Sequence, residues 1–405
     1  MERLLTRLLA SRSCAQWSRG ASTIAEVATL QLEFRALSRH TGNPVYDALA
    51  SRVIDYLAAM PEAGDDTWPA DLPRGLYPMF ISVESGKFTS QEITLGARAD
   101  SLYEYLLKQW LLSGRTDARM RSMYDASVSA IRTHLVRRGG GARCGNCTYL
   151  ASWNHRTKNH REQMDHLACF TPGMLALGAA GDTYEADMQL ARELMATCYQ
   201  MYEHSPSGLA PEIAEFSTNQ KVTAAANARH SLLRPETVES LLILWRLTGD
   251  AKYREWGWRI FEAIERHARV PTGGFSPVKD VTASQLKFDG RMESFFTAET
   301  LKYLYLLFGD GAQIPLDQYV FNTEAHPLRI HPDYAYGAQW GALPSLADLN
   351  GRATSAANTN STGRSGSGSS AGRGDPAMAE EQARMRALVE ARAALLARMP
   401  ATLSS

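Results

Sequence analysis

Thr248-Gly249-Asp250-Ala251-Lys252-Tyr253 separates two segments, 234–248 and 252–269, whose apolar residues recur with the period of an α-helix. The residues on the apolar faces are Val238, Leu241, Leu242 and Trp245 in the first segment, and Tyr253, Trp256, Ile260, Ile264 and Ala268 in the second. Glycine commonly ends a helix at the residue after its C-cap, and Asp, Asn or Thr commonly caps the next helix. This stretch therefore predicts a helical hairpin.

The same kind of turn recurs along the chain. Its glycines are Gly42, Gly114, Gly181 and Gly249, spaced by about 70 residues. Each interval has room for a helical hairpin and an excursion. The excursions are rich in Pro or Gly and suit loops that carry function; they are 71–90, 138–163, 206–232 and 271–290. Repeated helical pairs predict an all-α fold, either an open solenoid or a closed α/α toroid.

The two ends of the sequence differ from this repeating part. Residues 1–20 are rich in Arg and Ser, and they fit either an organelle targeting segment or a mis-annotated start. We expect one folded domain over 21–345. Residues 351–375 are a low-complexity mixture of Ser, Gly, Thr, Asn and Arg, which predicts a disordered linker. Residues 376–405 are expected to form a C-terminal helical tail.

Composition excludes some classes of function. The chain has 405 residues, of which 44% are hydrophobic, and its 43 basic residues balance 43 acidic ones. Without an excess of positive charge, a general nucleic-acid binder is not expected. No apolar run approaches the length that crosses a bilayer, so we expect no transmembrane segment in this chain.

Six short blocks each carry a carboxylate, usually beside aromatic residues or arginine. The blocks are Gln31–Arg35, Ala97–Tyr105, Ala210–Ile213, Leu233–Glu239, Met292–Phe296 and Asn322–Pro327. Acids among apolar neighbours are costly to bury unless a partner compensates for the lost hydration. Taken singly, most have ordinary interpretations, such as an exposed helix pair for Glu33 or a helix start for Pro235-Glu236. Gathered together, they would form a sugar-cleaving or cation-binding site.

These blocks, together with five overlapping or neighbouring motifs, carry a family resemblance. The motifs are Leu37-Ser38-Arg39, Leu95–Ser101, Met164–Phe170, Leu232–Ser240 and Phe321–Leu328. At these residues the chain resembles the class I α-1,2-mannosidases of glycoside hydrolase family 47, from about Ser22 to Ile330. The resemblance implies an (α/α)7 barrel, a toroid of helical hairpins that agrees with the turn periodicity.

The resemblance also implies an activity. Members of the family are Ca²⁺-dependent, inverting hydrolases that remove terminal α-1,2-linked mannose from high-mannose N-glycans in the endoplasmic reticulum or Golgi lumen. An inverting hydrolase needs a general acid and a general base, with carboxyl groups roughly 6.5–9.5 Å apart. By resemblance, Glu236 is the general base and Asp100 a second carboxylate of the same centre.

Other site residues follow from the same resemblance. Thr323 is implied as the calcium anchor, with Glu324 acting through water, and Phe295 as the platform beneath a sugar ring. The implied substrate-binding set is Glu33, Arg98, Glu104, Glu212, Arg234, Glu239, Glu293, Phe295, Glu299 and Glu324. His166 and His326 are interpreted as structural residues rather than metal ligands.

Cys169 and Cys198 match the disulfide positions of the family. Such a bond favours a lumenal, oxidising compartment, although the chain has no clear signal peptide.

The chain also departs from the family. The glutamate usually assigned as general acid lies in a Phe-Glu-x-x-Ile-Arg context, which has no equivalent in residues 1–32. We therefore expect a barrel that is incomplete because its first helices are missing, with weak or no activity. The alternative hypothesis is a non-catalytic, mannosidase-like lectin that recognises high-mannose glycans. A helical interaction scaffold is a third and less favoured interpretation.

Overall fold

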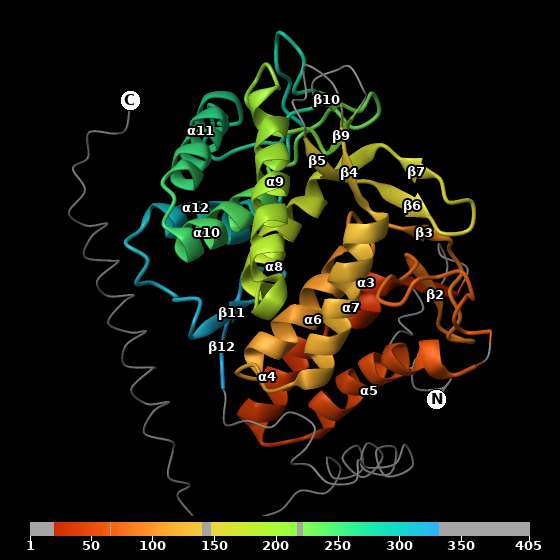
Figure 1. Ribbon diagram of the computed structural model, residues 1–405. Coiled ribbons are helices and arrows are strands. Elements are labelled where there is room, and N and C mark those ends of the chain that lie inside the picture. The colour runs from red at the N-terminus through yellow and green to blue at the C-terminus, as the bar shows by residue number, and fades with distance from the viewer. Residues whose placement is uncertain (1–19, 65, 140–146, 217–221, 332–405) are drawn as a thin grey trace, which may run out of the picture. The chain divides into compact units, whose positions relative to one another are not determined.

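The computed structural model describes residues 20–64, 66–139, 147–216 and 222–331, and Figure 1 shows their path. Helices dominate this part of the chain, as the sequence predicts. Within it, no helix is both long enough and apolar enough to cross a membrane. The predicted linker and C-terminal tail, and all but the last residue of the predicted N-terminal segment, lie outside the described residues.

The helices follow one another mostly in pairs. The α-helices are α3 (Ile24–Ala28), α4 (Gln31–Thr41), α5 (Val45–Ala59), α6 (Asp100–Leu112), α7 (Ala118–His134), α8 (Thr171–Gly178), α9 (Tyr184–Glu203), α10 (Glu236–Thr248), α11 (Lys252–His267) and α12 (Leu301–Phe308). Short 3₁₀ turns are η1 (Met60–Glu62), η2 (His166–Phe170) and η3 (Gly181–Thr183), and η4 (Phe296–Thr300) is a π-helical turn.

Short antiparallel strands occupy much of the sequence between the helical pairs. They are β1 (Ala21–Thr23), β2 (Phe80–Ser82), β3 (Glu92–Ile93), β4 (Val136–Arg138), β5 (Thr148–Leu150), β6 (Ser152–Asn154), β7 (His160–Arg161), β8 (Gln163–Asp165), β9 (Ile213–Glu215), β10 (Thr223–Ala224), β11 (Tyr319–Phe321) and β12 (Pro327–Arg329). They pair as β1-β2, β10-β9-β8, β11-β12, β3-β6-β7 and β4-β5. In β8-β9 the register places Met164 opposite Ala214. Short strands thus interrupt three of the four predicted loops, 71–90, 138–163 and 206–232.

The predicted hairpin turns are present at the positions that glycine marks. Gly249 ends α10 with a left-handed φ of 68°, and Gly42 ends α4 with a φ of 66°. Residues with a Cβ rarely adopt this conformation, so glycine is the residue that suits it. Asp117 begins α7, where its side chain accepts a hydrogen bond from the Met120 amide at 3.3 Å. The sequence prediction of helical hairpins is confirmed at these turns.

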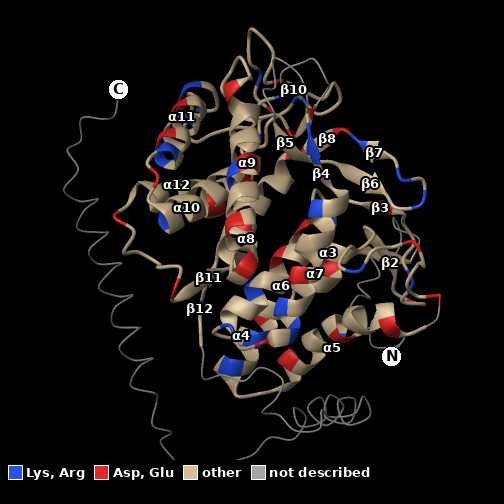
Figure 2. Cartoon of the chain, in the orientation of Figure 1, with Lys and Arg blue, Asp and Glu red and all other residues tan. Residues whose placement is uncertain are grey.

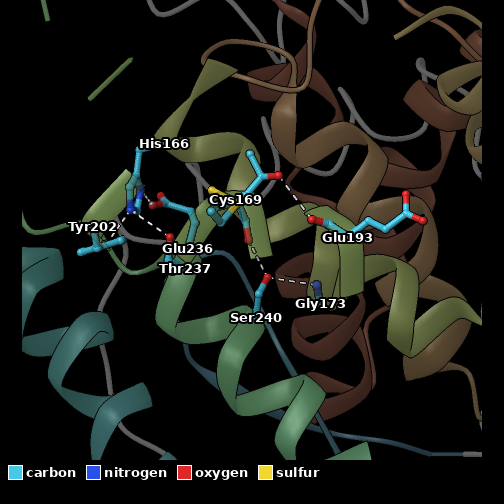
Figure 3. Close-up of a disulfide and its surroundings, with 10 residues drawn as sticks. His166, Cys169, Gly173, Glu193, Tyr202, Glu236, Thr237 and Ser240 are labelled. Atoms are coloured by element: carbon cyan, nitrogen blue, oxygen red, sulfur yellow. Dashed lines mark hydrogen bonds and ion pairs between the residues drawn. A yellow bond between two sulfur atoms is a disulfide. The ribbon is translucent and has the colours of Figure 1, made fainter. Parts of the chain in front are cut away.

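The close contact between α8 and α10 depends on a small residue and a hydroxyl. A Cβ on Gly173 would lie 2.8 Å from Ile243 Cδ1 and 3.2 Å from Ser240 Cα, so a larger residue would require the side chain of Ile243 to move. The Gly173 amide donates to Ser240 Oγ at 3.0 Å, and that hydroxyl donates to the Cys169 carbonyl at 2.5 Å (Figure 3). The buried face of α10, including Val238, Leu241 and Leu242, is 0% exposed. This packing fixes the helix that begins at Glu236.

A buried arginine links α4, α5 and the start of α7. Arg35 is 1% exposed, with its Nε 3.4 Å from Asp47 Oδ1 and its Nη2 3.3 Å from Asp117 Oδ2. Asp47 is 0% exposed. Because Glu33 lies on the same helix two residues earlier, this ion pair also holds α4 beside the acids described below.

A disulfide joins Cys169 in η2 to Cys198 in α9 across a sequence separation of 29 residues (Figure 3). The pairing implied by the family resemblance is therefore confirmed. The bond lies three residues after His166, so it ties the segment that carries this histidine to the long helix α9.

We predict that Arg35→Met lowers the free energy of unfolding by about 3–5 kcal/mol, because it leaves the buried Asp47 carboxylate without its cation. Urea unfolding monitored by circular dichroism measures the change. Arg259→Met is the matched control, since Arg259 pairs with Glu255 on the surface of α11; its loss should change the stability much less than the loss of Arg35 does. Equal losses for the two variants would contradict a structural role for the Arg35 pair.

We predict that Cys198→Ser lowers the free energy of unfolding by about 3–4 kcal/mol, because the unfolded chain regains the freedom of the closed loop. The comparison is made by denaturant titration of both proteins under non-reducing conditions. Adding reductant to the wild-type protein should lower its stability, while the variant should lose little more. A variant as stable as the oxidised wild-type protein would be inconsistent with this bond.

Candidate active site

Five carboxyl groups surround one small cavity of about 130 Å³. They come from α6, α10 and η4, and the turn between β11 and β12 adds a hydroxyl. The lining residues are Asp100, Ser101, Glu104, Leu167, Phe170, Pro235, Glu236, Glu239, Glu299 and Thr323. Asp100, Glu236 and Thr323, which are far apart in the sequence, are therefore neighbours in space.

Two of these acids, Asp100 and Glu236, lie at the starts of helices. Asp100 is the first residue of α6 and Glu236 the first residue of α10, directly after Pro235. The unpaired amides of a first helical turn favour negative charge, and proline suits this position because it lacks an amide hydrogen. The Ser101 amide donates to Asp100 Oδ1 at 2.9 Å. The spacing i, i+3 and i, i+4 then places Glu239 and Glu104 one turn further along the same faces.

Burial and mutual repulsion change the acidity of this cluster. The pKa of Asp100 is raised to about 7, chiefly by burial; the nearby Glu104 and Glu236 carboxylates contribute to the rise, and hydrogen bonds from Ser101 oppose it. Burial also raises the pKa of Glu299 to about 8, with added repulsion from Glu324, Glu236, Glu239 and Glu104. The cavity therefore holds both protonated and ionised carboxyl groups near neutral pH, which is the condition for acid–base catalysis.

His166 contacts Glu236 directly. Its Nδ1 lies 3.0 Å from Glu236 Oε2, while its Nε2 lies 2.7 Å from the Tyr202 hydroxyl and 3.0 Å from Thr237 Oγ1 (Figure 3). The histidine is 3% exposed. Interpreting it as merely structural missed this contact. The position of His166 within the Met164–Phe170 motif could have indicated a functional residue. The sequence alone does not show that its side chain contacts Glu236.

A second group of predicted residues lies together outside the cavity lining. Arg234 Nε pairs with Glu212 Oε2, and the Arg234 guanidinium lies 5.4 Å from the centre of the Phe295 ring. Leu233 supports this arrangement with a strained φ of 61° and a carbonyl that accepts from Thr300 Oγ1 at 2.7 Å. The unusual backbone turn precedes Arg234 and Glu236, which lie two residues apart in one short segment.

Thr323 lies in the tight turn between β11 and β12. Asn322 Oδ1 closes the turn by accepting from the amides of Glu324 and His326, at 3.0 and 2.7 Å. The Tyr105 hydroxyl donates to Glu33 Oε1 at 2.8 Å and also hydrogen-bonds to the Thr323 side chain. Glu33 is thereby tied to the turn, since Asn322 Nδ2 also donates to its Oε1 at 2.8 Å.

The donor set near Thr323 suits a hard cation held by oxygen atoms. Among the described residues, Glu33 Oε2 is buried and has no hydrogen-bond partner, so one carboxylate oxygen has unused capacity beside the turn. No group of three or more His, Cys, Asp or Glu residues in the described ranges forms a metal cluster. A cation here would depend on neutral oxygens and water, with the acids further away, which is a coordination that Ca²⁺ accepts.

Three further predicted substrate-binding residues also lie outside the cavity lining. Arg98 is exposed, adopts a φ of 80° and lies 5.4 Å over the Phe80 ring. Glu293 lies 3.8 Å from Arg291, and Glu324 is exposed. These residues flank the acidic centre rather than line it.

A larger cavity of about 580 Å³ shares no lining residue with the acidic one. It lies along α7 and is lined in part by Trp110, Arg121 and Arg132. The Arg121 guanidinium lies 4.8 Å over the Trp110 ring and so covers an aromatic face on which a sugar could stack. Size alone therefore does not identify the site.

Comparison with known proteins agrees with this geometry. Residues 5–330 match the model of glycosyl hydrolase family 47. The chain is 45% identical over 317 residues to the human endoplasmic reticulum mannosyl-oligosaccharide 1,2-alpha-mannosidase, covering 76% of this chain and 43% of that enzyme. It is 42% identical to the mannosyl-oligosaccharide alpha-1,2-mannosidase IA of Drosophila melanogaster, covering 80% of this chain and 47% of that enzyme. The chain thus spans about half the length of these curated relatives.

A solved structure is also similar. The alpha-1,2-mannosidase from Trichoderma reesei superposes with a TM-score of 0.67 at 30% identity, over 77% of this chain and 67% of that one. A D-mannose isomerase with a TM-score of 0.52 and 13% identity shares the fold alone. The motifs, the acidic cavity and the relatives all lead to one assignment: this chain belongs to glycosyl hydrolase family 47.

Proposed function

We propose that this chain carries the acidic centre of a calcium-dependent, inverting exo-α-1,2-mannosidase that removes terminal mannose from high-mannose N-glycans. The observation that carries the proposal is the single cavity lined by Asp100, Glu236 and Thr323. The alpha-1,2-mannosidase names of its relatives support the substrate class.

Glu236 is the proposed general base. Its carboxylate takes a proton from a water molecule as that water attacks the anomeric carbon, and the glycosidic bond breaks on the opposite face of the sugar. His166 holds the Glu236 carboxylate from the side through its Nδ1. A single displacement of this kind inverts the configuration.

Asp100 is the proposed second carboxyl group of the reaction. Because its pKa is raised to about 7 by burial, a fraction of the group keeps its proton near neutral pH. A protonated carboxyl can supply a proton to the departing oxygen, directly or through water. Arg234 and Phe295 are placed to bind and stack against the sugar next to these acids.

Ca²⁺ is the proposed cofactor; Thr323 would hold it, and Glu324 and other nearby acids would act on it through water. When bound, it supplies positive charge that orients sugar hydroxyl groups. The unpaired Glu33 Oε2 and the hydrogen bond between Tyr105 and Thr323 support this location.

We further propose that the helices of residues 21–345 form part of an (α/α)7 barrel with the acidic cavity on its inner side. The likeness to the Trichoderma reesei enzyme supports this architecture. We also propose a lumenal location, in the endoplasmic reticulum or Golgi. The Cys169–Cys198 disulfide supports an oxidising compartment, and the name of the human relative supports the endoplasmic reticulum.

We predict that Glu236→Gln reduces mannose release from a high-mannose N-glycan by at least about 100-fold, because an amide cannot accept the proton of the attacking water. Chromatography of the released sugar measures the rate, with and without a Ca²⁺ chelator, which should also abolish release. Glu262→Gln, an exposed position on α11, is the matched control and should retain the wild-type rate.

The outcomes separate the two functions that the sequence leaves open. Glycan binding by wild-type protein without any release would favour the lectin. Neither binding nor release would reject both, and release that survives Glu236→Gln would reject Glu236 as the base.

We predict that the stability of the wild-type protein falls as pH rises from about 4 to 7, in part because of Asp100. Its folded pKa of about 7 exceeds the usual 3.8, so the folded state binds more protons than the unfolded state in this window. Asp100→Asn should therefore flatten the decrease, measured as the free energy of unfolding at intervals of one pH unit without divalent cations. Asp125→Asn, at an exposed ion pair, should keep the wild-type slope. An unchanged slope in Asp100→Asn would contradict a raised pKa for this group.

A further inference from the structure

Lys108 is a buried cation beside the acidic cavity, and the mechanism above gives it no role. It is 4% exposed and lies on α6, one helical turn after Glu104 and two turns after Asp100. Lysine is rarely buried to this extent unless it is paired. Its side chain does not line the cavity itself, whereas Glu104 and Glu239 do.

Lys108 joins two helices through two carboxylates. Its Nζ forms an ion pair with Glu104 Oε1 of α6 and lies 3.4 Å from Glu239 Oε1 of α10. Both glutamates line the cavity. From α12, the hydroxyl of Tyr303 also hydrogen-bonds to Glu239. Lys108 therefore contacts one oxygen of each carboxylate, and each retains one oxygen outside the ion pair.

Lys108 also offsets part of the negative charge of the cavity. Asp100, Glu104, Glu236, Glu239 and Glu299 share one cavity, and ionising all five without a neighbouring cation would be strongly unfavourable. Burial raises the pKa of Glu239, and the Lys108 ammonium group acts against that rise. In the same cavity, a divalent cation at Thr323 would attract every carboxylate free to turn toward it.

We propose that Lys108 is a positioning residue that holds the Glu104 and Glu239 carboxylates as acceptors for sugar hydroxyl groups and prevents them from becoming ligands of the cation. This inference rests on the proposed function and deepens it, because it divides the acids of one cavity between two ligands. In this scheme Glu104 and Glu239 bind the sugar, and the turn at Thr323 binds the cation.

The proposal makes two predictions of opposite sign for Lys108→Met, which keeps the length of the side chain and removes its charge. Two carboxylates become free to turn, and the cavity gains a net negative charge. Ca²⁺ binding should therefore become tighter, on the order of tenfold. Binding of the sugar should become at least about fivefold weaker, because its acceptors are no longer held in place.

The experiment measures both ligands on the same folded proteins at pH 8. Isothermal titration calorimetry gives the affinity for Ca²⁺ alone, and saturation-transfer NMR at saturating Ca²⁺ gives the affinity for methyl α-mannoside. Lys108→Arg keeps the charge and should retain most of both affinities. Lys279→Met, at an exposed lysine, is the matched control and should change neither.

Structural damage predicts a different pattern. A loosened cavity would bind both ligands more weakly, and this result, or no change in either affinity, would overturn the proposal. If Lys108→Met does not fold, the pair Glu239→Gln and Lys108→Met/Glu239→Gln replaces it, since the double variant removes one charge of each sign. Tighter Ca²⁺ binding by the double variant than by Glu239→Gln supports the proposal, and equal or weaker binding overturns it.

Failure of the proposed function gives a separate result. Wild-type protein that binds neither Ca²⁺ nor the sugar would reject the calcium-dependent mannosidase and, with it, the role given to Lys108. Wild-type protein that binds both, with no opposite shifts in the variant, rejects the role of Lys108 alone.

Discussion

The central constraint on this molecule is the cost of gathering carboxyl groups in a small, poorly hydrated space. Like charges repel strongly where water is scarce, and each buried carboxylate loses its hydration. The structure meets this cost by several means: the first turns of α6 and α10 receive Asp100 and Glu236, a buried ammonium group contacts two further acids, and some groups keep their protons. The fold around the cavity can be understood as the framework that holds these arrangements in place.

The elements predicted best from sequence were those with a local cause. The apolar period of 236–248 and the glycine at 249 reflect interactions within a few residues, so they defined α10 and its end. The small strands escaped prediction because segments such as Gln163–Asp165 and Ile213–Glu215 gain their structure only by pairing with each other across about 50 residues. Residues 138–163 and 206–232 consequently looked like plain loops.

For the candidate site, too, the sequence predicted some residues and missed others. The motifs identified Asp100, Glu236 and Thr323 as members of one centre, and the structure places all three around one cavity. What sequence could not supply were the partners that approach from other segments, such as His166 beside Glu236 and Lys108 between Glu104 and Glu239. A histidine and a lysine have many ordinary uses, so their relevance depends on distances that no spacing rule provides. Arg98 and Glu293 show the converse, since residues inside strong motifs can lie on the periphery.

The cross-link between η2 and α9 has a consequence for how the centre matures. Because Cys169 follows His166 by three residues, the covalent bond anchors the short segment that positions this imidazole against the Glu236 carboxylate. A newly synthesised chain with reduced thiols would contain every residue of the centre and still lack one of the restraints on Glu236. Formation of the disulfide and the position of the Glu236 carboxylate are thus coupled through a single turn of backbone.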